Sequence, residues 1–157
     1  YHLIYQFGNT VTTGGRMSNK SSGNAFEHDL AEYMSRRGWW AHIFQDNRNG
    51  QPFDIVLARD GRTQVGDCKV CEDDVFRLSR MEPNQISAMT YWVECGNEDP
   101  WYFILLEMSD LVVSIRFSDL MKARKAGVKS LNADQMQEMS ELLCRDWEKR
   151  KLRGVGL

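Results

Sequence analysis

The sequence predicts an α/β (α+β) fold in which a mixed central sheet is flanked by helices. Helical periodicity and strand-like runs alternate in the order helix, three strands, helix, two strands and then helices. The pair Asp60-Gly61 separates two of the strand-like runs and is a strong signal for a β-hairpin. The run 101–106 is aromatic or aliphatic throughout, as in a buried central strand.

The first half of the chain contains one predicted helix and three predicted strands. From Ser22 the apolar residues fall on one helical stripe, and Gly38 ends the helix. The next two runs are rich in aromatic and β-branched residues, and the hairpin turn then returns the chain as a third strand. The expected elements are a helix over 22–37 and strands over 39–44, 53–59 and 62–70.

The second half has recognisable helix starts. Pro83 suits a first helical position, Ser118 suits a helix cap, and the sequence from Asn132 to Gln135 resembles a capping box. The expected elements are a helix from 83 to a stop at Gly96, strands over 101–107 and 111–117, a short helix at 118, and a last amphipathic helix carrying Met136, Met139, Leu142, Leu143 and Trp147.

Length and composition bound the organisation. With 157 residues and 42% hydrophobic content, the chain suffices for one domain with its own core. Residues 1–21 show no sustained periodicity and are expected to form a flexible arm before a single domain over 22–157. The net charge of −2 excludes a global basic field, so any contact with DNA must be local.

The cellular setting is expected to be cytoplasmic and free of membrane. The four cysteines have irregular spacing and no secretory segment is visible, which favours a reducing cytosol. The longest apolar run, 101–106, is far shorter than a membrane span.

The hairpin carries the residues of chemical interest. Strand alternation places Val65, Asp67, Lys69 and Cys71 on one face of the strand 62–70. Asp54 is expected beside them, on the face of its strand opposite Phe53, Ile55 and Leu57, and Glu27 on the first helix leans toward the same sheet edge.

Three converging carboxylates repel one another unless a cation neutralises them. Mg²⁺ prefers carboxylate oxygens, retained waters and substrate phosphate, so Glu27, Asp54 and Asp67 are predicted metal ligands, with Mn²⁺ as a substitute. A neighbouring lysine, Lys69, stabilises charge or orients water as a phosphodiester is hydrolysed. Taken alone, an acid and a lysine two positions apart on a strand are more often a solvated face.

These residues resemble the PD-(D/E)XK nuclease superfamily, whose motif is an Asp followed by Asp/Glu-X-Lys on a hairpin after an acid-bearing helix. The matching positions are Pro52-Phe53-Asp54 and Asp67-Cys68-Lys69. More narrowly, Ser22-Gly23-Asn24-Ala25-Phe26-Glu27, Phe76-Arg77-Leu78 and Asn84-Gln85-Ile86 are similar to segments of bacterial RecU, a Holliday junction resolvase. The chain departs from the pattern by one extra residue between Pro52 and Asp54 and by Asn84 where histidine is expected.

The resemblance implies a restriction-endonuclease-like αβββαβ core and an endodeoxyribonuclease of bacterial or phage origin. It implies a homodimer that requires Mg²⁺ or Mn²⁺ and makes symmetric nicks in four-way junctions during recombination and repair. It also gives Gln85 a supporting catalytic role, although a glutamine in a first helical turn is by itself more often merely exposed.

Several alternatives stay open. The substrate is a four-way junction or another DNA such as duplex ends, flaps or foreign DNA, or the chain is an inert relative that only binds. The basic residues Arg36, Arg37, Lys149, Arg150 and Lys151 are expected to contact DNA, and the last three equally suit a solvated helix end. Trp39, Trp40 and Trp92 suit core packing better than base stacking. Cys68 and Cys71 point to opposite strand faces, which disfavours zinc.

Overall fold

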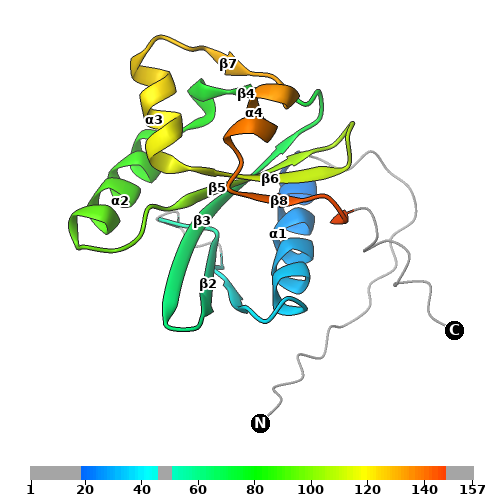
Figure 1. The fold of residues 1–157 in the computed structure, drawn as a ribbon, viewed down its shortest axis with the longest axis vertical. Helices are drawn as coiled ribbons and strands as arrows, with labels where there is room; N and C mark the ends of the chain where they lie inside the picture. The colour runs from blue at the N-terminus through cyan, green and yellow to red at the C-terminus, as the bar shows by residue number, and fades with distance from the viewer. Residues whose placement is uncertain (1–18, 46–50, 148–157) are drawn as a thin grey trace, which may run out of the picture.

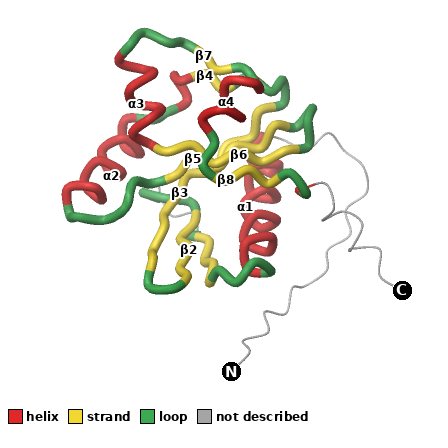
Figure 2. Tube along the Cα trace, viewed as in Figure 1, coloured by secondary structure: helices red, strands yellow, loops and turns green. Residues whose placement is uncertain are grey.

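The computed structural model describes residues 19–45 and 51–147, which form one six-stranded mixed sheet with helices on both faces. The strand order is β1-β2-β3-β5-β6-β8, and all neighbours are antiparallel except the parallel pair β3 and β5. Figures 1 and 2 show α1 on one side of this sheet and α3 and α4 on the other. The predicted fold class and the αβββαβ order are confirmed.

The elements that build the core follow the predicted order. They are α1 (Asn19–Ser35), β1 (Trp40–Ile43), β2 (Ile55–Arg59), β3 (Arg62–Cys71), α2 (Pro83–Glu94) and β5 (Trp101–Leu106). The helix α1 begins three residues earlier than predicted, so the end of the expected arm is helical and its first 18 residues lie outside the described part.

The rest of the chain extends the sheet and covers one face. These elements are β6 (Leu111–Arg116), α3 (Phe117–Lys125), α4 (Ala133–Met139) and β8 (Leu142–Cys144), with a 3-10 turn (Leu78–Arg80) and a separate two-stranded sheet of β4 (Phe76–Arg77) and β7 (Ser130–Leu131). No helix within residues 19–45 or 51–147 combines the length and apolar character needed to span a bilayer.

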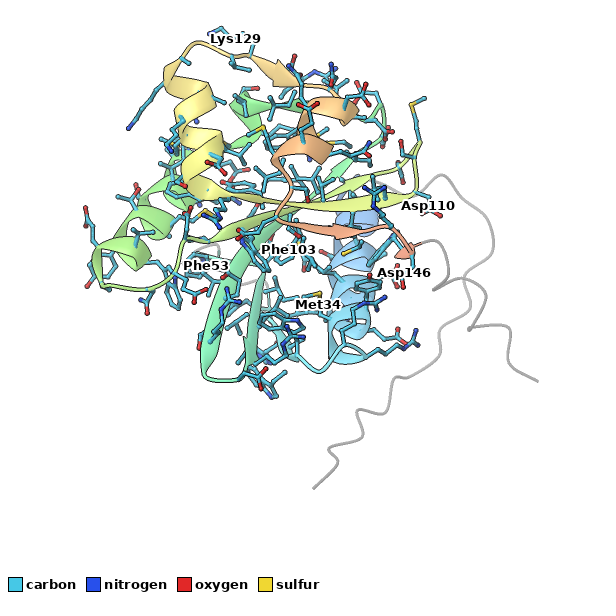
Figure 3. All side chains as sticks on the ribbon, in the orientation of Figure 1. Met34, Phe53, Phe103, Asp110, Lys129 and Asp146 are labelled. Atoms are coloured by element: carbon cyan, nitrogen blue, oxygen red, sulfur yellow. The ribbon has the colours of Figure 1, made fainter. Side chains whose placement is uncertain are left out.

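Two hydrophobic cores lie on the two faces of the sheet, and alternation along β5 divides its side chains between them. Trp101, Phe103 and Leu105 pack with α1, whereas Tyr102, Ile104 and Leu106 pack with the helices of the other face. Phe103 and Met34 belong to the α1 core (Figure 3). A strand buried on both faces has a continuous apolar sequence, which explains why the sequence identified β5.

The last predicted helix is wrong in its second half. The capping box of Asn132 and Gln135 is present, but α4 ends at Met139. Residues 142–144 instead form β8 and pair with the free edge of β6. The apolar spacing suited a helix, yet edge pairing satisfies the backbone and still buries Cys144 and Trp147 against α1.

Two further local predictions are corrected. Ser118 is not the cap of α3; the N-cap is Arg116, and the Asp99 carboxylate accepts from the Ser118 N–H at 3.2 Å. Phe53 does not share a face with Ile55 and Leu57, because β2 begins only at Ile55 and the chain before it turns the phenyl ring toward Trp92.

Gly66 fixes the distance between β3 and β5 next to the predicted site. A Cβ at Gly66 would lie 2.5 Å from Phe103 Cε2 and 2.9 Å from the Trp101 carbonyl oxygen. The second contact is with backbone, so a larger residue must push the strands apart. The close approach of these parallel strands therefore depends on glycine here.

We expect Gly66→Ala to lower the free energy of unfolding by about 2–3 kcal/mol, because overpacked cores cost this much. The matched control is Gly23→Ala on α1, where an added Cβ meets nothing within 4 Å. That change should raise stability by about 0.5–1 kcal/mol through helix propensity. Urea unfolding measures both, and equal stabilities of Gly66→Ala and wild type would contradict the steric argument.

Candidate active site

Two of the three predicted acids, Asp54 and Asp67, lie together where β2 and β3 stop pairing. Ladder pairing between these strands ends at Ile55 and Gly66. Beyond it the Asp54 N–H donates to the Gly66 carbonyl at 2.9 Å, and the Cys68 N–H donates to Asp54 Oδ2 at 2.8 Å. The Asp54 side chain thus takes the place of the next backbone acceptor, which fixes its carboxylate beside β3.

Asp67, Lys69 and Gln85 form a connected cluster on the α2 side of β3. Lys69 Nζ lies 3.0 Å from Asp67 Oδ2 as an ion pair. Gln85 Nε2 donates to Asp67 Oδ1 at 2.7 Å, and Lys69 Nζ donates to Gln85 Oε1 at 3.4 Å. Gln85 is the third residue of α2, so the first turn of that helix lies against the two strand residues.

The electrostatics of the cluster are set by burial. The Asp67 side chain is only 1% exposed and that of Lys69 only 11%. Burial raises the pKa of the Asp67 carboxyl well above its usual range, the Lys69 ammonium opposes this, and the Asp54 charge adds to it. Oδ2 of Asp67 is buried and receives no hydrogen bond among the described residues despite its ion pair. The cluster therefore holds a carboxylate whose negative charge is incompletely compensated.

Glu27 approaches from the opposite face of the sheet. Cys68 faces α1, and its buried thiol has a pKa raised first by burial and then by the charges of Asp54, Asp67 and Glu27. Glu27 is half-buried on α1. Within the described ranges, no three His, Cys, Asp or Glu side chains lie close enough to hold one ion. Ligation by Glu27 stays a prediction, whereas Asp54 and Asp67 lie together.

The other predicted contacts with DNA lie elsewhere. Arg36 is ion-paired with Glu32, and Arg37 with Asp146 (Figure 3) while its guanidinium stacks 3.5 Å from the centre of the Tyr33 ring. Both arginines are at the end of α1 remote from Glu27, roughly 13 Å along the helix axis. Lys149, Arg150 and Lys151 lie outside the described residues.

Two features of the site are invisible in the sequence. The Cys68 N–H anchors Asp54, and because N–H and C=O of one strand residue point to the same side, the Cys68 carbonyl also faces the Asp54 side. Tyr102 is the parallel-sheet neighbour of Asp67, and its buried hydroxyl has no hydrogen-bond partner among the described residues. The glycine at position 66 could have indicated that another strand packs closely there, but the sequence does not show which strand it is.

The cysteine and tryptophan alternatives are resolved by burial. Cys68 and Cys71 are free thiols that belong to opposite cores, as alternation predicted. Trp39 is buried in the α1 core, and Trp92 packs edge-on against Phe53. Trp40, in contrast, is 61% exposed, so the expectation of core packing is wrong for this residue.

Comparisons with known proteins give a likeness in structure alone. No protein-family model matches the chain, and no curated protein matches it in sequence. Among solved structures the chain is similar to Hjc, a Holliday junction resolvase of the archaeal hyperthermophile Archaeoglobus fulgidus, with a TM-score of 0.55 and 13% identity over 80% of this chain and 98% of that chain. This likeness establishes the fold, and closeness to RecU stays a prediction.

The raised pKa of Asp67 gives a testable dependence of stability on pH. In metal-free protein the folded state holds the Asp67 proton at pH values where the unfolded chain has lost it. Its contribution to stability is therefore fully present below the ordinary carboxyl pKa and is lost as pH rises through the folded pKa. We expect Asp67→Asn to gain stability relative to wild type as pH rises from about 4 to 8.

Urea unfolding in EDTA across this range measures the effect. Asp73→Asn is the matched control, because Arg77 lowers the pKa of that exposed carboxyl. Its stabilising contribution is present above the ordinary pKa and lost as pH falls, so the control slope has the opposite sign. Parallel pH profiles for the Asp67 variant and wild type would rule out a raised pKa at Asp67.

Proposed function

We propose that this chain is a metal-dependent DNA endonuclease that hydrolyses phosphodiester bonds. The observation that carries the proposal is the linked set of buried Asp67 with half-buried Lys69 and Gln85, next to Asp54 where two strands diverge. Acids and a lysine on a solvated face would be exposed and mobile, but here the lysine is almost buried and bonded. Support also comes from the fold, which is similar to that of a Holliday junction resolvase.

The donor set fits a divalent cation. Asp67 Oδ2 is a buried oxygen without a hydrogen bond among the described residues, and Asp54 lies next to it. Mg²⁺ binds through one or two carboxylates and completes its shell with waters and substrate phosphate, so two acids suffice. Asp54 and Asp67 would hold Mg²⁺, or Mn²⁺ in its place, and the Cys68 carbonyl faces the same side. When bound, the ion supplies Lewis-acid polarisation of the phosphate and activation of water.

The remaining side chains neutralise charge on the phosphate and hold the geometry of the site. Lys69, paired with Asp67, offers positive charge to phosphate oxygens as the transition state forms. Gln85 ties the Asp67 carboxylate to Lys69, so that the two groups keep one geometry when the substrate enters. Glu27, whose charge acts on Cys68 from the α1 side, is proposed as a further ligand of the ion.

The finer proposal is a Holliday junction resolvase acting as a homodimer. Hjc, of similar fold, is itself a Holliday junction resolvase. Two symmetric cuts in one junction need two sites related by a twofold axis, which a homodimer provides. Nuclease action on duplex ends, flaps or foreign DNA is the second candidate, because the Asp54–Asp67–Lys69 geometry handles a phosphodiester and does not select the shape of the DNA.

We expect Lys69→Ala and Asp54→Ala each to lower Mg²⁺-dependent cleavage of a synthetic four-way junction by at least about 100-fold while the fold is retained. Removing one preorganised charge-stabilising group costs this much in other enzymes. The assay compares the junction with a linear duplex and a flap of matched sequence. Lys129→Ala, which changes an exposed lysine between α3 and β7 (Figure 3), is the control and should cleave normally.

The products separate the candidates. Paired symmetric nicks confined to the junction support a resolvase, and equal cleavage of all three substrates supports a nuclease of broader specificity. Binding without cleavage in both Mg²⁺ and Mn²⁺ favours an inert relative. Full activity of Lys69→Ala would show that the assignment of the active site is wrong.

The basic end of the chain allows a separate test. If Lys149, Arg150 and Lys151 bind phosphates, their combined replacement by alanine should reduce the slope of log K against log salt by about 0.9 for each phosphate that is no longer neutralised. Fluorescence anisotropy with labelled DNA in EDTA measures this slope. An unchanged slope would show that these residues do not bind phosphates.

A further inference from the structure

An aromatic row lies along the edge strand β1 and the residue after it: Trp40 and His42 are exposed, and Phe44 is half-buried. Trp40, His42 and Phe44 are alternate residues and so project from one face of the sheet. The indole of Trp40 is 61% exposed, although tryptophan is among the residues most buried on average. The Trp40 and His42 rings are nearly parallel, with an interplanar angle of 11° and centroids 5.9 Å apart.

This row is on the same sheet face as the candidate active site. Strand register pairs Trp40 with Ala58 and Ala58 with Thr63, and the next row joins His42, Val56 and Val65. Partners in register share a face. In β3 the residues Thr63, Val65, Asp67 and Lys69 follow one another on that face.

The row also reaches the acids directly. The Phe44 N–H donates to the Asp54 carbonyl at 3.0 Å, so the last member of the row is bonded to a residue of the site. Trp40 lies four residues back along β1, about 13 Å from Phe44. This distance equals about four stacked base steps of one DNA strand.

We propose that Trp40 and His42 form a stacking platform for unpaired bases of the DNA strand that is cut at the acids. The inference rests on the proposed nuclease function and narrows its substrate class to DNA with unpaired bases beside the scissile phosphate. Flat aromatic rings that are open to solvent stack on any base without regard to sequence.

The alternative occupant of this face is a second copy of the chain. The structure favours DNA because the row leads toward the acids, where Phe44 donates its N–H to the Asp54 carbonyl. The Trp40 and His42 rings are parallel and so offer a flat face to an added base, whereas Phe44 meets His42 edge-on at 83°. A twofold contact elsewhere on the chain is compatible with the platform.

The test is binding without cleavage, measured by anisotropy in EDTA. The probes are a labelled oligothymidylate and a fully paired hairpin with the same number of phosphates. We expect Trp40→Ala to weaken binding of the oligothymidylate about tenfold and binding of the hairpin less than twofold, and Trp40→Phe to retain most of the affinity. Tyr91→Ala is the matched control, because Tyr91 is 69% exposed but lies on α2, outside the row.

Each outcome of this experiment supports or contradicts the proposed platform. Equal losses for both probes, or no loss for either, overturn the platform. So does a change of sedimentation from dimer to monomer in Trp40→Ala, which would assign the face to a second copy. Failure of wild type to bind the oligothymidylate also overturns it, while Mg²⁺-dependent junction cleavage would leave the proposed nuclease standing. If the chain binds the oligothymidylate through Trp40 but cleaves no DNA, the proposed nuclease function is contradicted and the platform is supported.

Discussion

The structure depends on keeping one carboxylate, that of Asp67, almost completely out of water. Burial of an acid is unfavourable unless cations and hydrogen-bond donors compensate it, and here Lys69 and Gln85 supply that compensation. Lys69 and Gln85 must both be held rigidly, since a mobile lysine would leave the Asp67 charge buried without a partner. A strand packed on both faces and a helix whose first turn abuts it meet this requirement. The raised pKa of Asp67 indicates that this compensation is incomplete.

The parallel pairing of β3 with β5 makes this arrangement possible. A parallel pair needs a crossover, and the crossover here brings α2 back so that Gln85 meets Asp67. On the other side β2 separates from β3 after Gly66, and the vacated backbone position is taken by the Asp54 carboxylate. The site thus lies between the pair β3–β5, whose strands stay hydrogen-bonded, and the pair β2–β3, whose strands separate. Gly66, at the branch point, lets β5 approach closely enough for the closed pair.

Alternation alone predicted that Asp67 and Lys69 project together, and the hairpin signal predicted that Asp54 lies beside them. Contacts between elements distant in sequence were not readable: nothing in the helical pattern around Gln85 indicates which strand its first turn abuts. The error at residues 142–144 has the same origin, because apolar residues spaced for a helix paired with the open edge of β6 instead. The role of Gln85 came only from the resemblance to PD-(D/E)XK nucleases and stays a prediction, because the likeness to Hjc shows the fold alone.

One face of the sheet departs from ordinary burial in two ways at once. Near α2 it buries a carboxylate and an ammonium, and near the β1 edge it leaves an indole 61% exposed. Each departure is unfavourable for folding, because charges prefer water and an indole prefers the core. Sequences usually satisfy such local rules, and the positions that break them tend to be functional. A backbone hydrogen bond between Phe44 and Asp54 links the two regions. A surface that places hard oxygens at one end and a flat apolar ring at the other matches the two components of a nucleotide, its phosphate and its base.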